Sequence, residues 1–499
     1  MSMRTLLGLV FIVASHSILR IEAAPPTDAG QAACSSLVSS LGSELVQSQS
    51  GSDFQDSVNT PLNLINTALV PACVVYPTNT SHVSTAMAAI YKAKSRYAVL
   101  AGGHSAMKGW NNVAGGVLID FKDMKQATYD AQRDTITLQP GIRWGEVVAA
   151  LAPQGVAPVG GRAAHVGSGF LLGGGISFLS PSRGWGADNF RELDVVLVNG
   201  TVVTANANNQ YKDLFKALKG GGNRFGIVTR YEVDAYHTGT PDDKRWVVGV
   251  IQYPESSVEA VVKATARYTK DVKDPNATIF STLVENASDS GEITTIMPLY
   301  VFYQGKELPK SIFGEFLSIP STNSSISPMS YADIAANIFP REDGRGSTFI
   351  FGSSALSGKD EKAFLDVYRT NLKFTKENRK QLSMTAITYT PIPDSQIEYG
   401  RKHGGNAIDA PLTGGYAVIQ MMQTLRPGQI EVPKSILDAK KKLLDQNKRT
   451  PGLPLFLNEC DANQNILASY GQYDFLKKTY KKYDPQGFNT RFTDGPMGL

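Results

Sequence analysis

The chain of 499 residues is 42% hydrophobic and 19% charged. This composition is typical of globular proteins, and the length allows roughly two to four domains. The formal net charge is only +4 and the Lys and Arg residues are dispersed, which argues against a nucleic-acid-binding protein. One basic run, at 440–442, falls in a predicted amphipathic helix, and we interpret it as a solvated helix face.

The N-terminus has the pattern of a secretory signal. Arg4 precedes an apolar run at 6–14, and Ala23 and Ala24 are small residues suited to cleavage, so we predict a signal peptide over residues 1–24. The apolar run is much shorter than the about 20 residues that span a bilayer, and no later stretch approaches that length. We therefore expect a secreted protein that does not cross a membrane.

Five Asn-x-Ser/Thr sequons agree with a route through the secretory pathway. They are Asn79, Asn199, Asn276, Asn286 and Asn323. Asn199 is the weakest glycosylation candidate, because Asn199-Gly200 is typical of a tight hairpin turn.

The chain has three cysteines, and an oxidising compartment favours pairing two of them. Cys34 and Cys73 enclose a loop of about 40 residues, whose closure is credited with roughly 4 kcal/mol of stabilisation by the chain-entropy model. We predict a disulfide between these two residues and a buried free thiol at Cys460. No Cys or His spacing suits a metal, so we expect no metal site.

Strands and helices alternate along the first half of the chain, which indicates an α+β fold. Ser81 is the expected N-cap of a helix whose apolar residues begin at Val83. The remaining expected elements are strands at 117–120 and 135–138, a helix at 144–151, a hairpin over 193–205 and a helix at 211–219.

The pattern changes after about residue 236. Amphipathic helices are predicted at 256–270 and 359–374, between strands at 293–303, 348–352 and 416–423. A Ser- and Asn-rich stretch at 322–327 is predicted to be an exposed loop. We interpret this part as a second domain, an antiparallel sheet covered by helices, followed by a C-terminal helix at 474–483.

Four glycine-rich segments require a common explanation. They contain Gly102-Gly103-His104-Ser105, residues 160–161, residues 167–175 and residues 220–226. None ends in Lys-Ser or Lys-Thr, which excludes a Walker nucleotide-binding loop. The glycines at 167–173 miss the spacing of the Rossmann dinucleotide-binding motif by one residue, and no serine lies in the Gly-x-Ser-x-Gly elbow of hydrolases. Loops that are nearly free of side chains suit a long cofactor with a diphosphate at its centre.

The order of these motifs resembles the FAD-linked oxidases of the berberine-bridge-enzyme-like group, in the vanillyl-alcohol-oxidase superfamily and of fungal type. The matching residues are Tyr76-Pro77, Gly102–Ser105, Gln139-Pro140-Gly141, Val166-Gly167, Leu172–Gly175, Ala187-Asp188-Asn189, residues 218–229, Asn458, Ala468–Gly471 and Tyr483-Asp484-Pro485. The resemblance covers roughly two-fifths of the chain on a count of these motifs. It implies a two-part, PCMH-type FAD-binding domain over 25–236 (core about 67–237), a substrate domain over 237–454, and a segment at 455–499 that returns to the first domain.

The resemblance also implies how FAD is held. His104 would be bonded through a ring nitrogen to the flavin 8α-methyl, which retains the cofactor and raises its reduction potential. Residues 161–167 lack the cysteine that makes a second link in many relatives, so a single link is expected. His165 is either stacked near the flavin or structural. The other implied FAD-binding residues are Gly102, Gly103, Ser105, Pro140, Gly141, Val166, Gly167, Gly173, Gly174, Asp188, Asn189, Gly226, Ile227, Val228, Asn458 and Tyr470.

On the substrate side, the strand at 416–423 resembles the family strand above the isoalloxazine. Alternation places Tyr416 and Gln420 on one face, where Gln420 would orient substrate. Many relatives read Asn-Tyr-Ala where this chain has Asn458-Glu459-Cys460, so either Glu459 or Tyr416 is a candidate base, unless Glu459 is only a surface change. Tyr470 and His403 are weaker candidates.

The resemblance implies an oxidase that takes hydride from an alcohol, an amine or a secondary-metabolite C–H bond. Dioxygen would be the acceptor, giving hydrogen peroxide, and the protein would be a monomer acting on a small molecule. A carbohydrate oxidase and a non-redox, flavin-containing cyclase remain alternatives.

Overall fold

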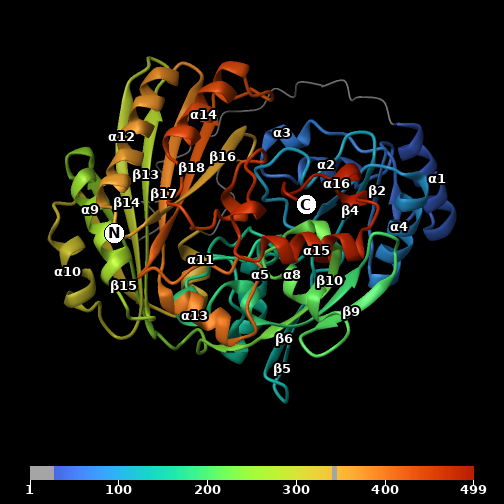
Figure 1. Ribbon diagram of the computed structural model, residues 1–499, viewed down its shortest axis with the longest axis horizontal. Helices are drawn as coiled ribbons and strands as arrows, with labels where there is room; N and C mark the ends of the chain where they lie inside the picture. Colours follow the sequence, from blue (N-terminus) through green and yellow to red (C-terminus); the bar gives the residue numbers. More distant parts are fainter. Residues whose placement is uncertain (1–26, 340–344) are drawn as a thin grey trace.

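The computed structural model describes residues 27–339 and 345–499. The predicted signal peptide at 1–24 lies outside this range. The fold is α+β, as predicted, with a long sheet and its helices on one side and two smaller sheets on the other (Figure 1). No helix of the described residues is long and apolar enough to cross a membrane.

The first sheet has four strands in the order β1-β2-β4-β3. Strands β2, β4 and β3 are parallel and their side chains are mostly buried on both faces, as expected for a covered parallel sheet. The strands are β1 (Val46–Gln47), β2 (Cys73–Val75), β3 (Tyr97–Leu100) and β4 (Val117–Asp120). The accompanying helices are α1 (Asp28–Leu41), α2 (Phe54–Asn59), α3 (Leu64–Thr67) and α4 (Thr80–Ala93).

The second sheet has five antiparallel strands in the order β5-β6-β10-β8-β9. Its strands are β5 (Ala127–Asp130), β6 (Thr135–Leu138), β8 (Phe190–Val196), β9 (Val202–Asn206) and β10 (Ile227–Asp234). Its helices are α5 (Trp144–Leu151), α6 (Gly169–Leu172), α7 (Ser180–Arg183) and α8 (Lys212–Leu218), and a short pair joins β7 (Val156–Ala157) to β11 (Tyr236–His237).

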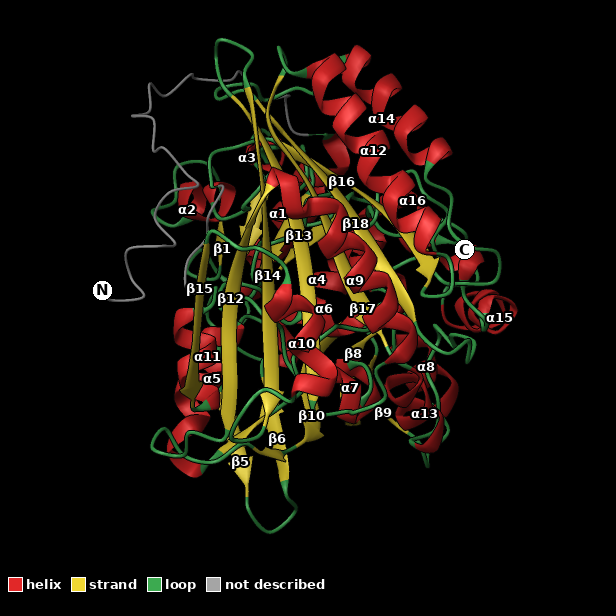
Figure 2. Ribbon diagram, turned by 90° about the vertical axis from the view of Figure 1, so that its left-hand side faces the viewer, coloured by secondary structure: helices red, strands yellow, loops and turns green. Residues whose placement is uncertain are grey.

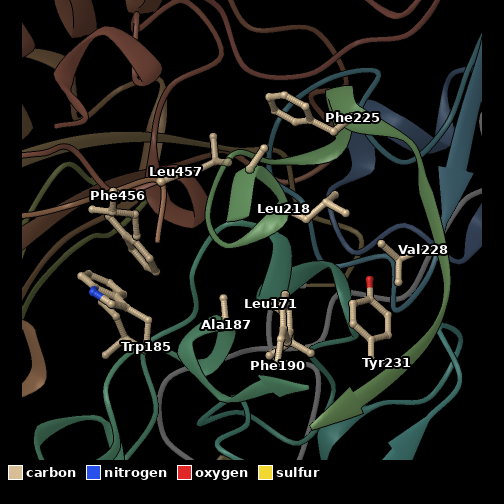
Figure 3. Close-up of a cluster of buried hydrophobic side chains, with 14 of the residues drawn as sticks. Leu171, Trp185, Ala187, Phe190, Leu218, Phe225, Val228, Tyr231, Phe456 and Leu457 are labelled. Atoms are coloured by element: carbon tan, nitrogen blue, oxygen red, sulfur yellow. The ribbon is translucent and has the colours of Figure 1, made fainter. Parts of the chain in front are cut away.

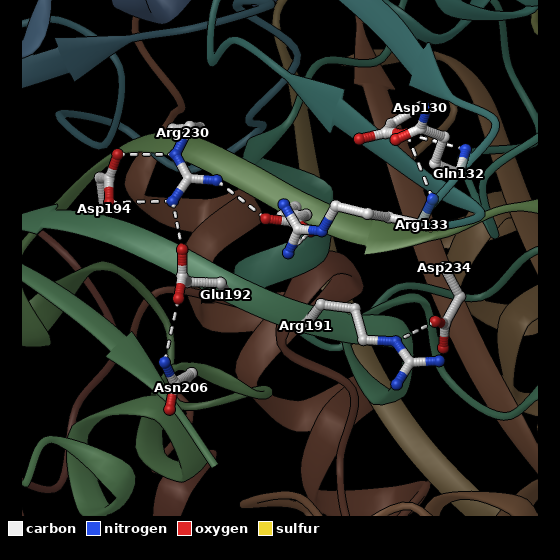
Figure 4. A network of polar contacts seen from close by, with 10 residues as sticks. Asp130, Gln132, Arg133, Arg191, Glu192, Asp194, Asn206, Arg230 and Asp234 are labelled. Atoms are coloured by element: carbon white, nitrogen blue, oxygen red, sulfur yellow. Dashed lines mark hydrogen bonds and ion pairs between the residues drawn. The ribbon is translucent and has the colours of Figure 1, made fainter. Parts of the chain in front are cut away.

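Charged side chains link adjacent strands on one face of this second sheet (Figure 4). Arg230 of β10 donates two hydrogen bonds to Asp194 and one to Glu192, both on β8. Glu192 in turn accepts from Asn206 on β9. Paired planar groups of this kind fix the strand alignment through geometry as well as charge.

The third sheet has seven antiparallel strands in the order β15-β12-β14-β13-β17-β18-β16. Its strands are β12 (Trp246–Pro254), β13 (Ala277–Ala287), β14 (Ile293–Gln304), β15 (Asn323–Met329), β16 (Phe349–Ser357), β17 (Leu382–Ile392) and β18 (Tyr416–Leu425). Figure 2 shows this sheet with helices packed across it. The helices of this part are α9 (Val258–Asp271), α10 (Lys310–Ser318), α11 (Tyr331–Asn337), α12 (Glu361–Asn378), α13 (Asp394–Lys402) and α14 (Lys434–Gln446).

Strand alternation gives the third sheet two different faces. On β18, Ala417, Ile419 and Met421 belong to an apolar core shared with α9, α12 and α14. Val418 and Tyr416 belong to a second core shared with the five-stranded sheet. The third sheet is therefore covered on its outer face and meets the rest of the chain with its inner face.

The C-terminal segment returns to the first part of the chain. Phe456 and Leu457 pack with Trp185 and Leu218 in one buried cluster (Figure 3). Helices α15 (Tyr473–Tyr483) and α16 (Phe488–Phe492) follow. The buried guanidinium of Arg224 donates to backbone carbonyls of four C-terminal residues, which are Asn489, Thr493, Gly495 and Pro496.

The disulfide prediction is confirmed. Cys34 of α1 is bonded to Cys73 of β2, and Cys460 is a buried free cysteine. The bond ties the first described helix to the parallel sheet.

Two local predictions were wrong. The N-cap of α4 is Asn79, not Ser81, because the Asn79 side chain accepts from the His82 backbone N–H. The stretch at 322–327 is not a loop, since most of it forms edge strand β15. Its polar residues are accommodated because an edge strand is exposed to solvent.

The interpretation of the run at 440–442 also needs correction. Lys440 is only 5% exposed and forms an ion pair with Asp461, while Lys441 is exposed and pairs with Asp445 along the helix. Burial lowers the pKa of Lys440 and the Asp461 charge opposes this shift. One face of α14 is solvated, but Lys440 lies on the other.

Removing Asp461 should therefore leave a buried ammonium without its counter-charge. We expect Asp461→Ala to lower the free energy of unfolding by about 3 kcal/mol. Asp445→Ala, which breaks the exposed pair of the neighbouring lysine, is the matched control and should leave the denaturation midpoint unchanged. Urea denaturation followed by tryptophan fluorescence measures both, and equal midpoints would contradict the buried pair's role.

Candidate functional site

A cavity of about 460 Å³ lies where the three sheets meet. One side of it is formed by loops that contain most of the glycines singled out from the sequence, and the other side by the seven-stranded sheet. The predicted cofactor residues that line it are Gly102, Gly103, His104, Ser105, Pro140, Val166, Gly167, Gly173, Gly226, Ile227, Val228 and Asn458.

Two of these glycines are required by close contacts. A Cβ on Gly102 would lie 2.5 Å from the backbone nitrogen of Gly167, and one on Gly173 would lie 1.9 Å from the side-chain oxygen Oδ1 of Asn458. Real Cβ atoms essentially never approach this closely. Arg143 supports the first contact, since its Nη2 donates to the Gly102 carbonyl at 3.2 Å and its backbone pairs with Gly167.

His104 lies in this wall beside a second histidine. The rings of His104 and His165 are stacked with centroids 4.8 Å apart, and their Nε2 atoms are 3.0 Å apart. Burial, with the positive charges of His165 and Arg143, lowers the pKa of His104 to about 3. The imidazole is therefore neutral at pH 7 and keeps a nitrogen lone pair.

The sheet contributes a wall of different character. Phe280 and Thr282 come from β13, Thr388 from β17 and Gln420 from β18, and all four line the cavity. Thr282 Oγ1 and Thr388 Oγ1 are 3.1 Å apart. The predicted alternation of the 416–423 strand thus brings Gln420 to the cavity.

Glu459 also lines the cavity, in a short 3₁₀ helix at Leu457–Glu459. Its Oε1 is 3.5 Å from Nη2 of Arg162, whose guanidinium lies 4.7 Å above the Phe280 ring. Burial raises the pKa of Glu459, and the Arg162 charge lowers it. Glu459 is therefore a cavity carboxyl and not a surface change.

The other predicted site residues lie away from the cavity. Tyr416 and Tyr470 are buried in the apolar core, and burial raises the pKa of both. The Tyr416 hydroxyl has no hydrogen-bond partner within the described ranges. Asp188 accepts from Trp185 N and Asn406 Nδ2, and Asn189 donates to the carbonyls of Arg183 and Trp185. Gly141 and Gly174 also do not line it, and His403 stacks on Tyr399.

Several cavity residues were not predicted. Arg162, Thr282, Thr388 and Asn111 line the cavity, and Asn111 is buried with neither side-chain polar atom hydrogen-bonded. Threonines in strands are too common to stand out in a sequence. Only Arg162 could have been suspected from the sequence, because it lies within residues 161–167, where many relatives carry the cysteine of a second covalent link.

The comparisons with known proteins bear on this cavity. Residues 71–206 match the family model described as FAD binding domain. An uncharacterized FAD-linked oxidoreductase of Arthroderma benhamiae is 29% identical over 422 residues, which cover 80% of this chain and 81% of that protein. The FAD-dependent monooxygenase prx3 of Penicillium roqueforti is 30% identical over 364 residues, covering 70% and 69%. The chain belongs to the family of FAD-dependent oxidoreductases that these relatives represent.

Solved structures share the fold of this FAD-linked oxidoreductase. The 6-hydroxy-D-nicotine oxidase of Arthrobacter nicotinovorans has a TM-score of 0.74 and 19% identity, and covers 91% of this chain and 97% of that one. The BBE-like 1 protein of Physcomitrella patens has a TM-score of 0.74 and 20% identity, with 95% and 99% covered. These likenesses establish the architecture around the cavity.

The residues present fit an FAD. The glycine wall offers backbone N–H groups to a diphosphate, and Gly169 has no atom within 4 Å of the position its Cβ would take, which leaves open space before it. The buried amide of Asn111, without a protein partner, suits a polar cofactor. Among residues 27–339 and 345–499, no cluster of His, Cys, Asp or Glu could hold a metal ion.

The backbone contact between Gly102 and Gly167 should control flavin retention. We expect Gly102→Ala to force the two loops apart and to lower the flavin content of the purified protein at least several-fold. Gly314→Ala is the control, because its Cβ would meet only Lys310 Cβ at 3.8 Å. The ratio of flavin absorbance to protein absorbance measures the effect. Full flavin content in Gly102→Ala would show that the loops tolerate separation.

Proposed function

We propose that this FAD-linked oxidoreductase is an oxidase acting on a small organic molecule. The observation that carries the proposal is the cavity itself, with a glycine-backbone wall on one side and Gln420, Thr388 and Glu459 on the other. One wall suits a cofactor and the other suits a substrate, so the two would meet within one cavity.

Bound FAD supplies the redox chemistry, as acceptor of hydride from a substrate C–H bond and as donor of electrons to dioxygen, which gives hydrogen peroxide. His104 would hold the flavin by a bond from a ring nitrogen to the 8α-methyl carbon. The neutral state of His104 supports this role, because only an unprotonated imidazole nitrogen can form the bond. With no cysteine in 161–167, the link would be single.

Glu459 is the group that we assign to proton transfer. It is the only carboxyl among the described lining residues, and burial raises its pKa towards the range useful to a general base. Gln420 would orient the substrate, because an amide accepts no proton at neutral pH. Tyr416 is buried in the apolar core away from the cavity, so we propose no chemical role for it.

A monooxygenase is the second candidate function. Its support comes from the curated relatives, several of which are named FAD-dependent monooxygenases, including prx3. We also propose a role in secondary metabolism, which the resemblance seen in the sequence implies. A carbohydrate oxidase would be recognised by release of peroxide with sugars as substrates. A non-redox cyclase would be recognised by turnover without reduction of the flavin.

We also propose that the protein is a secreted, glycosylated monomer. The disulfide supports an oxidising compartment. Asn79, Asn199, Asn276 and Asn323 are all exposed, but the Asn79 side chain caps α4 and the Asn199 side chain accepts from Thr201 N in a turn, while Asn286 is only partly exposed within β13. Asn276 and Asn323 are therefore the sequons that we expect to carry glycans.

Removing His104 should release the flavin. We expect wild-type protein to stay yellow after denaturation and His104→Ala to lose its flavin to the supernatant. Peptide mass spectrometry should find the flavin on the His104 peptide alone. Complete release of flavin from denatured wild-type protein would exclude the covalent link.

Substitution of Glu459 should slow substrate oxidation without loss of flavin. We expect Glu459→Gln to reduce the anaerobic rate of flavin reduction about a hundred- to ten-thousandfold. The wild-type rate of flavin reduction should rise with pH, because the deprotonated carboxylate is the active form. The midpoint of this rise should lie at a pH above the usual pKa of a glutamate, because burial raises the pKa of Glu459. Arg162→Met removes the charge that lowers this pKa, so the rise should move to still higher pH. A Glu459→Gln rate within about threefold of wild type, well below the expected range, would place the base elsewhere.

Labelled dioxygen separates the two candidate functions. We expect one hydrogen peroxide per substrate oxidised and no ¹⁸O in the product when turnover proceeds under ¹⁸O₂. Incorporation of one ¹⁸O atom without peroxide would instead establish a monooxygenase. A substrate panel screened by peroxide release comes first.

A further inference from the structure

Three polar side chains form one row across the inner face of the seven-stranded sheet. Thr282 of β13 is the register partner of Thr388 of β17, and Thr388 is the partner of Gln420 of β18. Directly opposed residues share a sheet face, and all three line the cavity. With strands about 4.8 Å apart, the row extends about 10 Å across the cavity wall.

The row has hydrogen-bonding capacity to spare. The two threonine hydroxyls are 3.1 Å apart, so one donates to the other and one hydroxyl hydrogen is left. The Gln420 amide makes no hydrogen bond with any residue in the described ranges, and it is only partly buried. Such an amide offers two donors and an acceptor to whatever lies in the cavity.

The rows on either side are mostly apolar. Val284, Ala386 and Met422 are register partners two residues further along the same three strands. On the other side, Val418 opposes Thr390, and Phe280 precedes Thr282 by two positions. Of these neighbours only Phe280 lines the cavity, and Phe351 of β16, which opposes Met422, lines it on the other side of the row, so a phenylalanine flanks the polar row on each side at the cavity wall.

The cavity presents one basic and one acidic side chain, and they face each other. Among the described lining residues, the only members of the Arg, Lys, Asp and Glu set are Arg162 and Glu459, whose Nη2 and Oε1 atoms are 3.5 Å apart, and His104 is neutral. A charged substrate would have to displace one of these partners. An uncharged one would not.

We propose that the strip formed by Thr282, Thr388 and Gln420 selects an uncharged, flat, ring-containing substrate that presents its hydroxyl or carbonyl oxygens along one edge. This inference rests on the proposed function in placing substrate against this wall. Phe280 and Phe351 would contact the ring on either side of the oxygens. A sugar, with hydroxyls around its whole ring, would leave some of them against these two side chains without partners.

The test uses holoenzyme and defined probes that need not be oxidised. Binding is measured anaerobically by titration calorimetry with 2,7-dihydroxynaphthalene, a flat molecule with both oxygens towards one edge. Naphthalene-2,7-dicarboxylate tests charge and cellobiose tests a sugar. Thr388→Val and Gln420→Leu remove hydrogen-bonding groups from the strip at similar volume.

Thr390→Val is the matched control. It makes the same substitution on the same strand and the same face as Thr388→Val, two residues away. Thr390 does not line the cavity and its hydroxyl is buried without a hydrogen-bond partner, so its loss should cost nothing.

We expect the diol to bind wild type and Thr390→Val equally. Thr388→Val and Gln420→Leu should each weaken its binding about three- to tenfold, the value of one neutral hydrogen bond. The dicarboxylate and cellobiose should bind at least tenfold more weakly than the diol.

Failure of the diol to bind, equal diol affinity in all variants, or tighter binding of cellobiose or the dicarboxylate would each overturn the proposal. None of these outcomes depends on turnover. The oxidase proposal fails separately, if no substrate reduces the flavin or if no peroxide appears.

Discussion

The backbone contact between Gly102 and Gly167 is the constraint on which the cavity depends. It joins the end of the four-stranded sheet to the loop before α6, and neither residue tolerates a Cβ there. Arg143 bonds to both loops and fixes their separation. A wall made of backbone can hold a long cofactor closely, but only while these two loops stay together.

The seven-stranded sheet divides two tasks between its faces. Its outer face packs on α9, α12 and α14, where even the buried Glu285 is held by Asn371, Thr375 and Thr385. Its inner face carries Gln420 and its neighbours towards the cavity. Because alternate residues serve different faces, the substrate wall can change in sequence without disturbing the core behind it.

The sequence predicted the fold class, the disulfide and most of the glycine wall, because those features depend on local pattern and on residues with special backbone properties. It did not predict which residues of the long strands face the cavity's centre. Tyr416 and Gln420 share a face, yet four residues of strand separate them by about 13 Å, enough to place one in the core and one at the site. Lys440 was wrongly assigned to a solvated helix face, and Arg162 was not predicted as a cavity residue. In both cases the partner, Asp461 or Glu459, is distant in sequence.

The hydrogen bonds from Arg224 to the carbonyls at 489–496 bear on how the holoenzyme assembles. The cavity is lined by residues from Tyr97 to Thr493, and Arg224 holds the carbonyls of Thr493 and Gly495. Residues held by Arg224 are thus part of the cavity wall. Because Arg224 and Thr493 are 269 positions apart in the sequence, the cavity is complete only in the folded chain, and we expect flavin to bind once these distant segments have come together.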